Sequence, residues 1–156
     1  MQGARERSGT GASTPAREAS RRGDPERAAL EDLAGFARKA RRRAHAPYSG
    51  FRVGAALRTR RGEIVTGCNV ENASFGLTLC AERVAVFKAV SEGLSDFDAV
   101  AVAADSRRLT PPCGSCRQIL WEFCGDLWIH LTDLRGRSQT LRLSQLLPLP
   151  FDARNL

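Results

Sequence analysis

The sequence lacks the long apolar runs that membrane proteins need. No stretch approaches the roughly 20 apolar residues that a transmembrane helix requires, and the first thirty residues hold no apolar core of the kind found in secretory signal peptides. Lysine is also scarce: Lys39 and Lys88 are the only two among 24 basic residues, and the rest are arginine. We therefore expect a protein of the cytoplasm that does not enter a membrane.

A disulfide framework is also missing. The chain has five cysteines, and an odd number without a secretion signal argues against paired half-cystines. Reduced thiols in a cytoplasmic protein are the better interpretation. Thiols that cluster at motif spacing then indicate a metal site or catalysis.

A concentrated block of charge is absent as well, although the net charge is +7. Residues 1–27 hold six arginines and four acidic residues, so they supply +2, and the remaining +5 is scattered. The one dense run, 38–43, falls near the end of an expected helix, where cations complement the helix dipole. Aromatic residues are rarely interleaved with the basic ones, so we do not expect a nucleic-acid partner.

The length of 156 residues suits one domain. Residues 1–25 are rich in small and polar residues without apolar periodicity, which predicts a disordered tail, and residues 26–156 form the expected domain. The expected elements are a helix from Asp24-Pro25 to the residue before Pro47, strands at 51–59 and 63–70, a helix at 80–91, a strand at 97–104, a helix at 115–124, and strands at 127–131 and 140–143. A hairpin followed by alternating helix and strand predicts an α/β sandwich with a partly parallel sheet.

The chemistry of the chain centres on Cys80-Ala81-Glu82 and, thirty residues later, Pro112-Cys113-Gly114-Ser115-Cys116. A Cys-x-x-Cys pair can bind one tetrahedral metal ion, and Cys80 is the natural third ligand. By itself, such a pair could equally be a redox motif. The fourth position has no obvious ligand, because the cysteines and histidines that remain do not lie at a paired spacing: Cys68, Cys124, His45 and His130.

Catalytic zinc sites keep three protein ligands and an open position for water. A carboxylate beside that water can remove its proton and pass protons to the substrate, which is the role predicted for Glu82. Three thiolates leave a Zn²⁺ site at a net charge of −1, so a positive group is needed nearby. Arg83 follows the motif directly, and we expect it to donate hydrogen bonds to the ligating sulfurs.

Cys-Ala-Glu upstream of Pro-Cys-x-x-Cys is the pattern of the zinc deaminases, in which the glutamate is not a ligand. Over roughly residues 26–151 the chain resembles the small homotetrameric cytidine deaminases of pyrimidine salvage. The motifs that carry this resemblance are Ala46-Pro47-Tyr48-Ser49-Gly50-Phe51-Arg52-Val53-Gly54-Ala55-Ala56, Gly67-Cys68-Asn69-Val70-Glu71-Asn72-Ala73, Cys80-Ala81-Glu82-Arg83, Pro112-Cys113-Gly114-Ser115-Cys116-Arg117-Gln118 and Leu146-Leu147-Pro148.

The resemblance implies a three-layer α-β-α sandwich with a mixed five-stranded sheet. It implies one Zn²⁺ per subunit on Cys80, Cys113 and Cys116, with Glu82 as the proton shuttle. The implied reaction is hydrolytic deamination of cytidine and 2′-deoxycytidine to uridine and 2′-deoxyuridine, with release of ammonia.

The resemblance also implies how a nucleoside is held. Asn69 and Glu71 would bind the ribose hydroxyls, Phe51 would pack against the pyrimidine, and the Ala81 backbone N–H would meet the ring carbonyl. Asn and Glu suit hydroxyl groups by their donors and acceptors. Taken alone, however, Asn69 fits a strand-end turn equally well, and Phe51 fits the core.

Three further residues would reach the site of a neighbouring subunit in such a homotetramer: Ala73, Phe75 and Phe151. The active sites would then be shared between subunits. Relatives often carry tyrosine at the position of Phe75, so a hydroxyl near the sugar is missing here.

Two alternatives remain open at this point. One is a related deaminase of another aminopyrimidine, such as blasticidin S. The other is a zinc-ribbon module that grips nucleic acid, which requires a fourth ligand and leaves Glu82 without a role.

Overall fold

The computed structural model describes residues 27–156. The tail predicted for residues 1–25 and the helix start predicted at Asp24-Pro25 lie outside this part. The described elements, of which η2 and η3 are 3-10 helices, are α2 (Arg27–Arg41), β1 (Val53–Thr59), β2 (Ile64–Cys68), η2 (Phe75–Leu77), α3 (Ala81–Ser91), β3 (Phe97–Ala104), α4 (Gly114–Cys124), β4 (Trp128–Thr132), β5 (Ser138–Arg142), α5 (Leu143–Leu146) and η3 (Ala153–Asn155).

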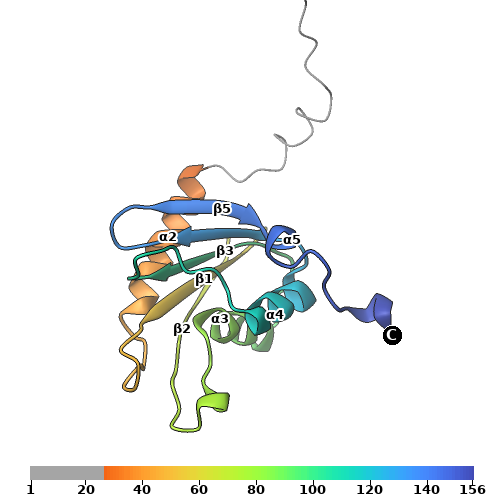
Figure 1. Cartoon of the computed structure of the whole chain (residues 1–156). Coiled ribbons are helices and arrows are strands. Elements are labelled where there is room, and N and C mark those ends of the chain that lie inside the picture. Colours follow the sequence, from red (N-terminus) through yellow and green to blue (C-terminus); the bar gives the residue numbers. More distant parts are fainter. Residues whose placement is uncertain (1–26) are drawn as a thin grey trace, which may run out of the picture.

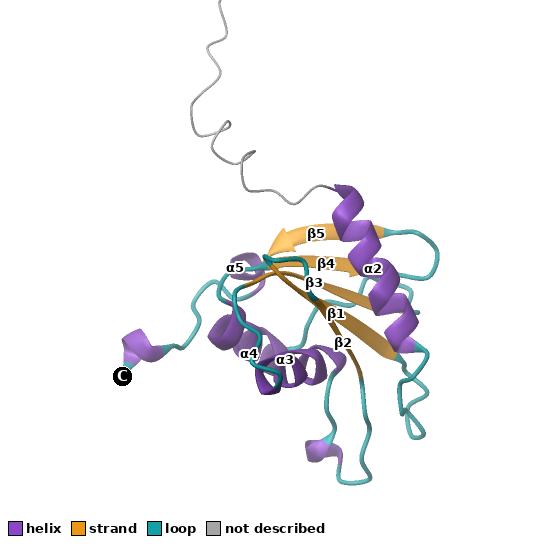
Figure 2. Ribbon diagram, turned by 180° about the vertical axis from the view of Figure 1, so that it is seen from behind, coloured by secondary structure: helices purple, strands orange, loops and turns teal. Residues whose placement is uncertain are grey.

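The five strands form one mixed sheet in the order β2-β1-β3-β4-β5. The β3–β4 pair is parallel, and the other three pairs are antiparallel. Helix α2 covers one face of the sheet, while α3 and α4 lie side by side on the other (Figures 1 and 2). This architecture confirms the predicted three-layer α-β-α sandwich with a mixed five-stranded sheet.

The alternation of side chains in the central strand β3 divides the core in two. Alanines 99, 101 and 103 face α2, where they join the apolar side of that helix. Residues 100, 102 and 104 face α3 and α4, where the larger core cluster lies. Successive side chains of a strand point to opposite faces, which explains this division. The small residues under α2 let the helix approach the sheet closely.

Two glycines allow both helix layers to touch the sheet. A Cβ at Gly54 of β1 would lie 2.1 Å from the Ala37 carbonyl oxygen of α2. A Cβ at Gly67 of β2 would lie 2.4 Å from the Ala81 carbonyl oxygen and 2.5 Å from the Ala85 nitrogen of α3. Neither glycine has a positive φ, so the requirement is for space. Gly67 in particular sets where the first turn of α3 lies.

The ends of some elements differ from the prediction. Helix α2 ends at Arg41, although the sequence predicted a helix up to the residue before Pro47, and residues 42–46 instead form turns and a bridge. Strand β5 begins at Ser138 and ends at Arg142, whereas the sequence predicted residues 140–143. The short helix α5 and the two 3-10 helices were not predicted. In the part of the chain that the structure describes, no helix combines the length and apolar character needed to span a membrane.

Candidate active site

Three cysteine sulfurs meet where α3 and α4 begin. Cys80 is the N-cap residue of α3, Cys113 is the N-cap residue of α4, and Cys116 lies in the first turn of α4. The Cys80 and Cys113 sulfurs are 3.8 Å apart, and all three sulfurs lie within 4.8 Å of one another. Sulfurs bound to one tetrahedral Zn²⁺ at about 2.3 Å are separated by about 3.8 Å. The trio therefore fits a zinc ion.

No fourth protein ligand joins this cluster among residues 27–156. Cys124 packs against the main core, where burial raises the pKa of its thiol to about 12. His130 is directed at α2, on the other face of the sheet, with Nε2 3.5 Å from a Glu31 carboxylate oxygen. The closed four-ligand site of a zinc ribbon is therefore not formed in the described part, and the trio leaves one coordination position open, as catalytic zinc sites do.

Positive groups surround the three sulfurs. Both N-cap cysteines lie at helix N-termini, where the helix dipole favours negative charge. Arg83 donates to the Thr78 carbonyl oxygen at 2.7 Å and contacts the Cys80 sulfur at 3.8 Å. The hydrogen bond from the Cys116 thiol and the nearby Arg83 guanidinium hold the pKa of Cys80 at about 5, despite its partial burial. The site thus favours a thiolate at Cys80.

Arg117, which follows Cys116 in sequence, serves a different purpose. Its guanidinium donates to the carbonyl oxygens of Pro112 and Leu146, each at 2.8 Å. It therefore connects the loop before Cys113 to the end of α5. Of these two arginines, Arg83 is the one with a hydrogen bond to a sulfur.

The Glu82 carboxyl lies beside the sulfurs and is almost completely buried, with 5% of its surface exposed. The pKa of Glu82 is raised to about 7, chiefly by burial and also by the charge of Cys80. Hydrogen bonds to its own backbone N–H and to Cys116 oppose this shift. A bound cation would lower the pKa again. A carboxyl group that titrates near neutral pH can both accept and return a proton.

A hollow of about 250 Å³ opens beside Cys80, Glu82 and Cys113. Four residues predicted to hold a nucleoside line it together: Phe51, Asn69, Glu71 and Ala81. The sequence reasoning did not place Ser49, Val53, Thr78, Leu79, Thr110 and Pro111 in this hollow, although they also line it. Ser49 lies within one of the motifs that carry the resemblance, and Thr110-Pro111 directly precedes another. Their closeness to these motifs is the one feature of the sequence that could have placed them at the site.

Asn69 also supports the walls of this hollow. Its side-chain oxygen accepts from the Val53 N–H, and its side-chain nitrogen donates to the Phe51 carbonyl oxygen, both at 2.8 Å. The amide therefore fixes the backbone that carries the Phe51 ring. One N–H and one lone pair of the amide remain for another partner.

Glu71 plays a similar part in the turn that begins at Pro47. Its carboxylate accepts from the backbone N–H of Tyr48 at 2.8 Å and of Ser49 at 3.3 Å, and from the Ser49 hydroxyl. The hydroxyl bond and the Tyr48 N–H hold the pKa of Glu71 below its usual range. Glu71 therefore both stabilises the turn and lines the hollow.

The three residues predicted to act on a neighbouring subunit are not among those that line this hollow. Phe75 is 73% exposed and Phe151 is 60% exposed. The Phe75 ring meets the Tyr48 ring edge to face at 5.9 Å. Ala73 lies just before the 3-10 helix that carries Phe75.

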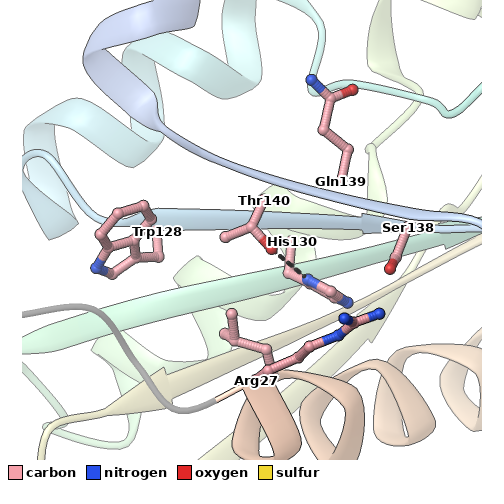
Figure 3. A pocket seen from close by; sticks show the side chains of 7 residues that line it. Arg27, Trp128, His130, Ser138, Gln139 and Thr140 are labelled. Carbon is pink, nitrogen blue, oxygen red and sulfur yellow. Dashed lines mark hydrogen bonds between the residues drawn. The ribbon is translucent and has the colours of Figure 1, made fainter. Parts of the chain in front are cut away.

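A larger hollow of about 420 Å³ lies on the opposite face of the sheet, between the start of α2 and strands β4 and β5 (Figure 3). In this hollow, His130 Nδ1 and the Thr140 hydroxyl form a hydrogen bond of 2.9 Å. No thiol or carboxylate lines this hollow. The only cluster of potential metal ligands in residues 27–156 lies on the other side of the sheet, at the starts of α3 and α4.

The comparisons with known proteins agree with this geometry. Residues 28–131 match the model of the cytidine and deoxycytidylate deaminase zinc-binding region. A cytidine deaminase of Halalkalibacterium halodurans is 50% identical over 119 residues, which are 76% of this chain and 90% of that protein. The crystal structure of a cytidine deaminase from Burkholderia pseudomallei superimposes with a TM-score of 0.76 at 44% identity, covering 78% of this chain and 98% of that one.

A more distant relative, the blasticidin-S deaminase of Bacillus cereus, is 33% identical over 107 residues, or 64% of this chain and 76% of that protein. The family model covers well over half of the chain, and it coincides with the three sulfurs and the buried carboxyl described above. The chain therefore belongs to the zinc-binding cytidine and deoxycytidylate deaminase family.

Proposed function

We propose that this protein hydrolyses cytidine and 2′-deoxycytidine to uridine and 2′-deoxyuridine, with release of ammonia, as a step of pyrimidine salvage. The observation that carries the proposal is the arrangement of three cysteine sulfurs at zinc-binding distances, with an open fourth position and the buried Glu82 carboxyl beside them. The names of the relatives at 44–50% identity support the choice of substrate.

In this proposal Cys80, Cys113 and Cys116 hold one Zn²⁺ per subunit. When bound, the ion supplies an activated water for attack on C4 of the pyrimidine. Glu82 would take a proton from that water and deliver it to N3 of the ring. It would then take the second proton from the hydroxyl group added at C4 and pass it to the amino group, which leaves as ammonia. The burial of its carboxyl group keeps competing water away from these proton transfers. Arg83 offsets the negative charge of the sulfurs.

The hollow beside this site suits a nucleoside. Phe51 offers an aromatic ring to the base, while Asn69 and Glu71 have hydrogen-bonding capacity left for hydroxyl groups. Ala81 is the first residue of α3, and the N–H of a first helical residue has no acceptor within its helix. That N–H is the proposed donor to the ring carbonyl.

We further propose that residues 26–156 form the catalytic domain and that four copies assemble with shared active sites. The apolar side chains exposed on α3 and α4 support the assembly, because Phe87 and Phe123 pair edge to face at 6.3 Å while each stays about 40% exposed. Ala73, Phe75 and Phe151 would then reach the hollow of a neighbouring copy. The five free thiols support a location in the cytoplasm.

Conversion of cytidine by the purified protein, followed by ultraviolet absorbance, tests the reaction. We expect Glu82→Gln to keep its zinc and to lose turnover by several orders of magnitude. Near-native activity in that variant would show that Glu82 is not the proton shuttle. If the zinc-loaded wild type does not convert cytidine, the substrate assignment is wrong, and blasticidin S becomes the next aminopyrimidine to assay.

A further inference from the structure

The segment that follows α5 is held by one helix, α4, which also carries two of the proposed zinc ligands. Figure 1 shows this segment leaving α5 and ending in η3. Two α4 side chains contact it: Gln118 donates to the Phe151 carbonyl oxygen at 2.5 Å, and Trp121 Nε1 donates to an Asp152 carboxylate oxygen at 3.0 Å. A third, Arg117, donates to the carbonyl oxygen of Leu146 at the end of α5 at 2.8 Å.

The Asp152 carboxylate is the centre of this attachment. Besides the Trp121 N–H, it accepts from the backbone N–H of Arg154 at 3.0 Å and from the Arg154 guanidinium at 2.6 Å. Its own backbone N–H donates to the Asn155 side chain at 2.9 Å, which completes the cap of η3. The carboxylate side chain is only 15% exposed, whereas the ring of the preceding Phe151 is 60% exposed.

We infer that Trp121 and Asp152 are positioning residues, whose hydrogen bond fixes the C-terminal segment so that the Phe151 ring is presented to the nucleoside hollow of a second copy. This inference rests on the proposed shared active site and deepens it. Trp121 and Asp152 touch no substrate in this scheme and act only through Phe151.

The physical reason lies in the order of the segment before substrate binds. Arg117 and Gln118 donate to main-chain carbonyl oxygens, which any residue would offer. Trp121 instead donates to the side chain of Asp152, the residue after Phe151. If the segment moved freely, each binding event would have to order it, which weakens affinity. Arg154 and Trp121 hold the pKa of Asp152 far below its usual range, so the bond keeps its charge-assisted character at working pH.

The first experiment is a double-mutant cycle on Trp121→Phe, which keeps an aromatic ring without the N–H, and Asp152→Ala. We expect each single variant to raise KM for cytidine by about 10–100-fold, the range of one hydrogen bond to a charged group. The KM of the double variant should not exceed the KM of the more strongly affected single variant. We expect kcat, zinc content and assembled mass to stay unchanged in all three variants. Asp152→Asn should restore part of the loss, because its amide oxygen can still accept.

The matched control is Glu122→Gln, at the exposed position next to Trp121 on the same helix, which should change none of these quantities. An unchanged KM in both single variants, or additive effects in the double variant, would overturn the inference. A fall in kcat together with zinc loss would instead show that Trp121 and Asp152 support the fold of α4 and do not position Phe151.

Phe151→Ala separates the inference from the proposal beneath it. If Phe151→Ala raises KM and Trp121→Phe does not, only the inference fails. If Phe151→Ala leaves KM unchanged, the shared site fails as well. Co-expression of Asp152→Ala with the inactive Glu82→Gln chain should return part of the turnover to the wild-type KM, because sites with an intact Glu82 then receive Phe151 from copies with an intact Asp152. A uniformly raised KM in the mixed assembly would contradict action between copies.

Discussion

Gly67→Ala is the substitution that most directly tests how the sheet places the catalytic groups. Gly67 in β2 faces the first turn of α3, and the two atoms nearest to an added Cβ are backbone atoms, the Ala81 carbonyl oxygen at 2.4 Å and the Ala85 nitrogen at 2.5 Å. Backbone atoms cannot rotate away as a side chain can. The first turn of α3, which carries Glu82, must therefore move away from the sheet.

The size of the effect follows from these distances. An ordinary carbon contact needs about 3.5 Å, so α3 must move by about 1 Å. Overpacking of a core typically costs about 1–3 kcal/mol of the free energy of unfolding, and a rigid neighbour favours the upper end. Displacement of catalytic groups by about 1 Å can lower activity by about 100-fold. We expect a loss of about 3 kcal/mol and a loss of kcat/KM of about 100-fold.

Gly54→Ala is the matched control, because an added Cβ there would lie 2.1 Å from the Ala37 carbonyl oxygen of α2, on the face of the sheet away from the sulfurs. It should lower stability by a similar amount, about 3 kcal/mol, and leave kcat/KM of the folded protein within about threefold of wild type. Denaturant unfolding, zinc content and steady-state kinetics measure all three quantities. Equal losses of kcat/KM in both variants would refute the argument that Gly67 places α3.

Three other outcomes are expected. Arg83→Gln should release zinc faster to a chelator, because the Cys80 sulfur loses its guanidinium partner; unchanged release would reject that role. Burial and the charges of Arg38 and Arg27 lower the pKa of His130, although Glu31 opposes them. Just below pH 6.5 the unfolded chain therefore binds more protons than the folded chain does. The free energy of unfolding should fall in this range as pH falls. That slope should flatten in His130→Gln, measured by urea unfolding. Chelation of zinc should lower the Tm, followed by circular dichroism, because the folded state is the one that holds the ion.

The sequence predicted the elements that have a strong apolar pattern. The continuous apolar run at 97–104 became β3 with the same bounds, and the cysteine spacing identified the only cluster of potential ligands found in residues 27–156. The short helices α5, η2 and η3 were not predicted. Helix η3 depends on the Asp152 cap and on contacts with α4, and such contacts are long-range, so no local pattern announces them.

The second function of Asn69 was also beyond the sequence. Its residue type suits both a turn and a ligand, and only the fold shows that its amide bridges the backbone at Phe51 and Val53 across the hairpin. The hollow likewise gains Thr110 and Pro111, which have no chemical signature. Their place depends on where β3 ends and α4 begins, and this is set by packing of the whole sheet.

The position of the cysteines at the starts of two separate helices has a consequence for the lifetime of the protein. Cys80 and Cys113 are 33 residues apart in sequence, so one ion that binds both closes a large loop of the chain. By the chain-entropy argument used for cross-links, closing such a loop disfavours the unfolded ensemble by about 3–4 kcal/mol. A copy without its ion would open more often and be degraded sooner. Metal supply in the cell would thereby regulate how much of this protein exists as well as how fast it works.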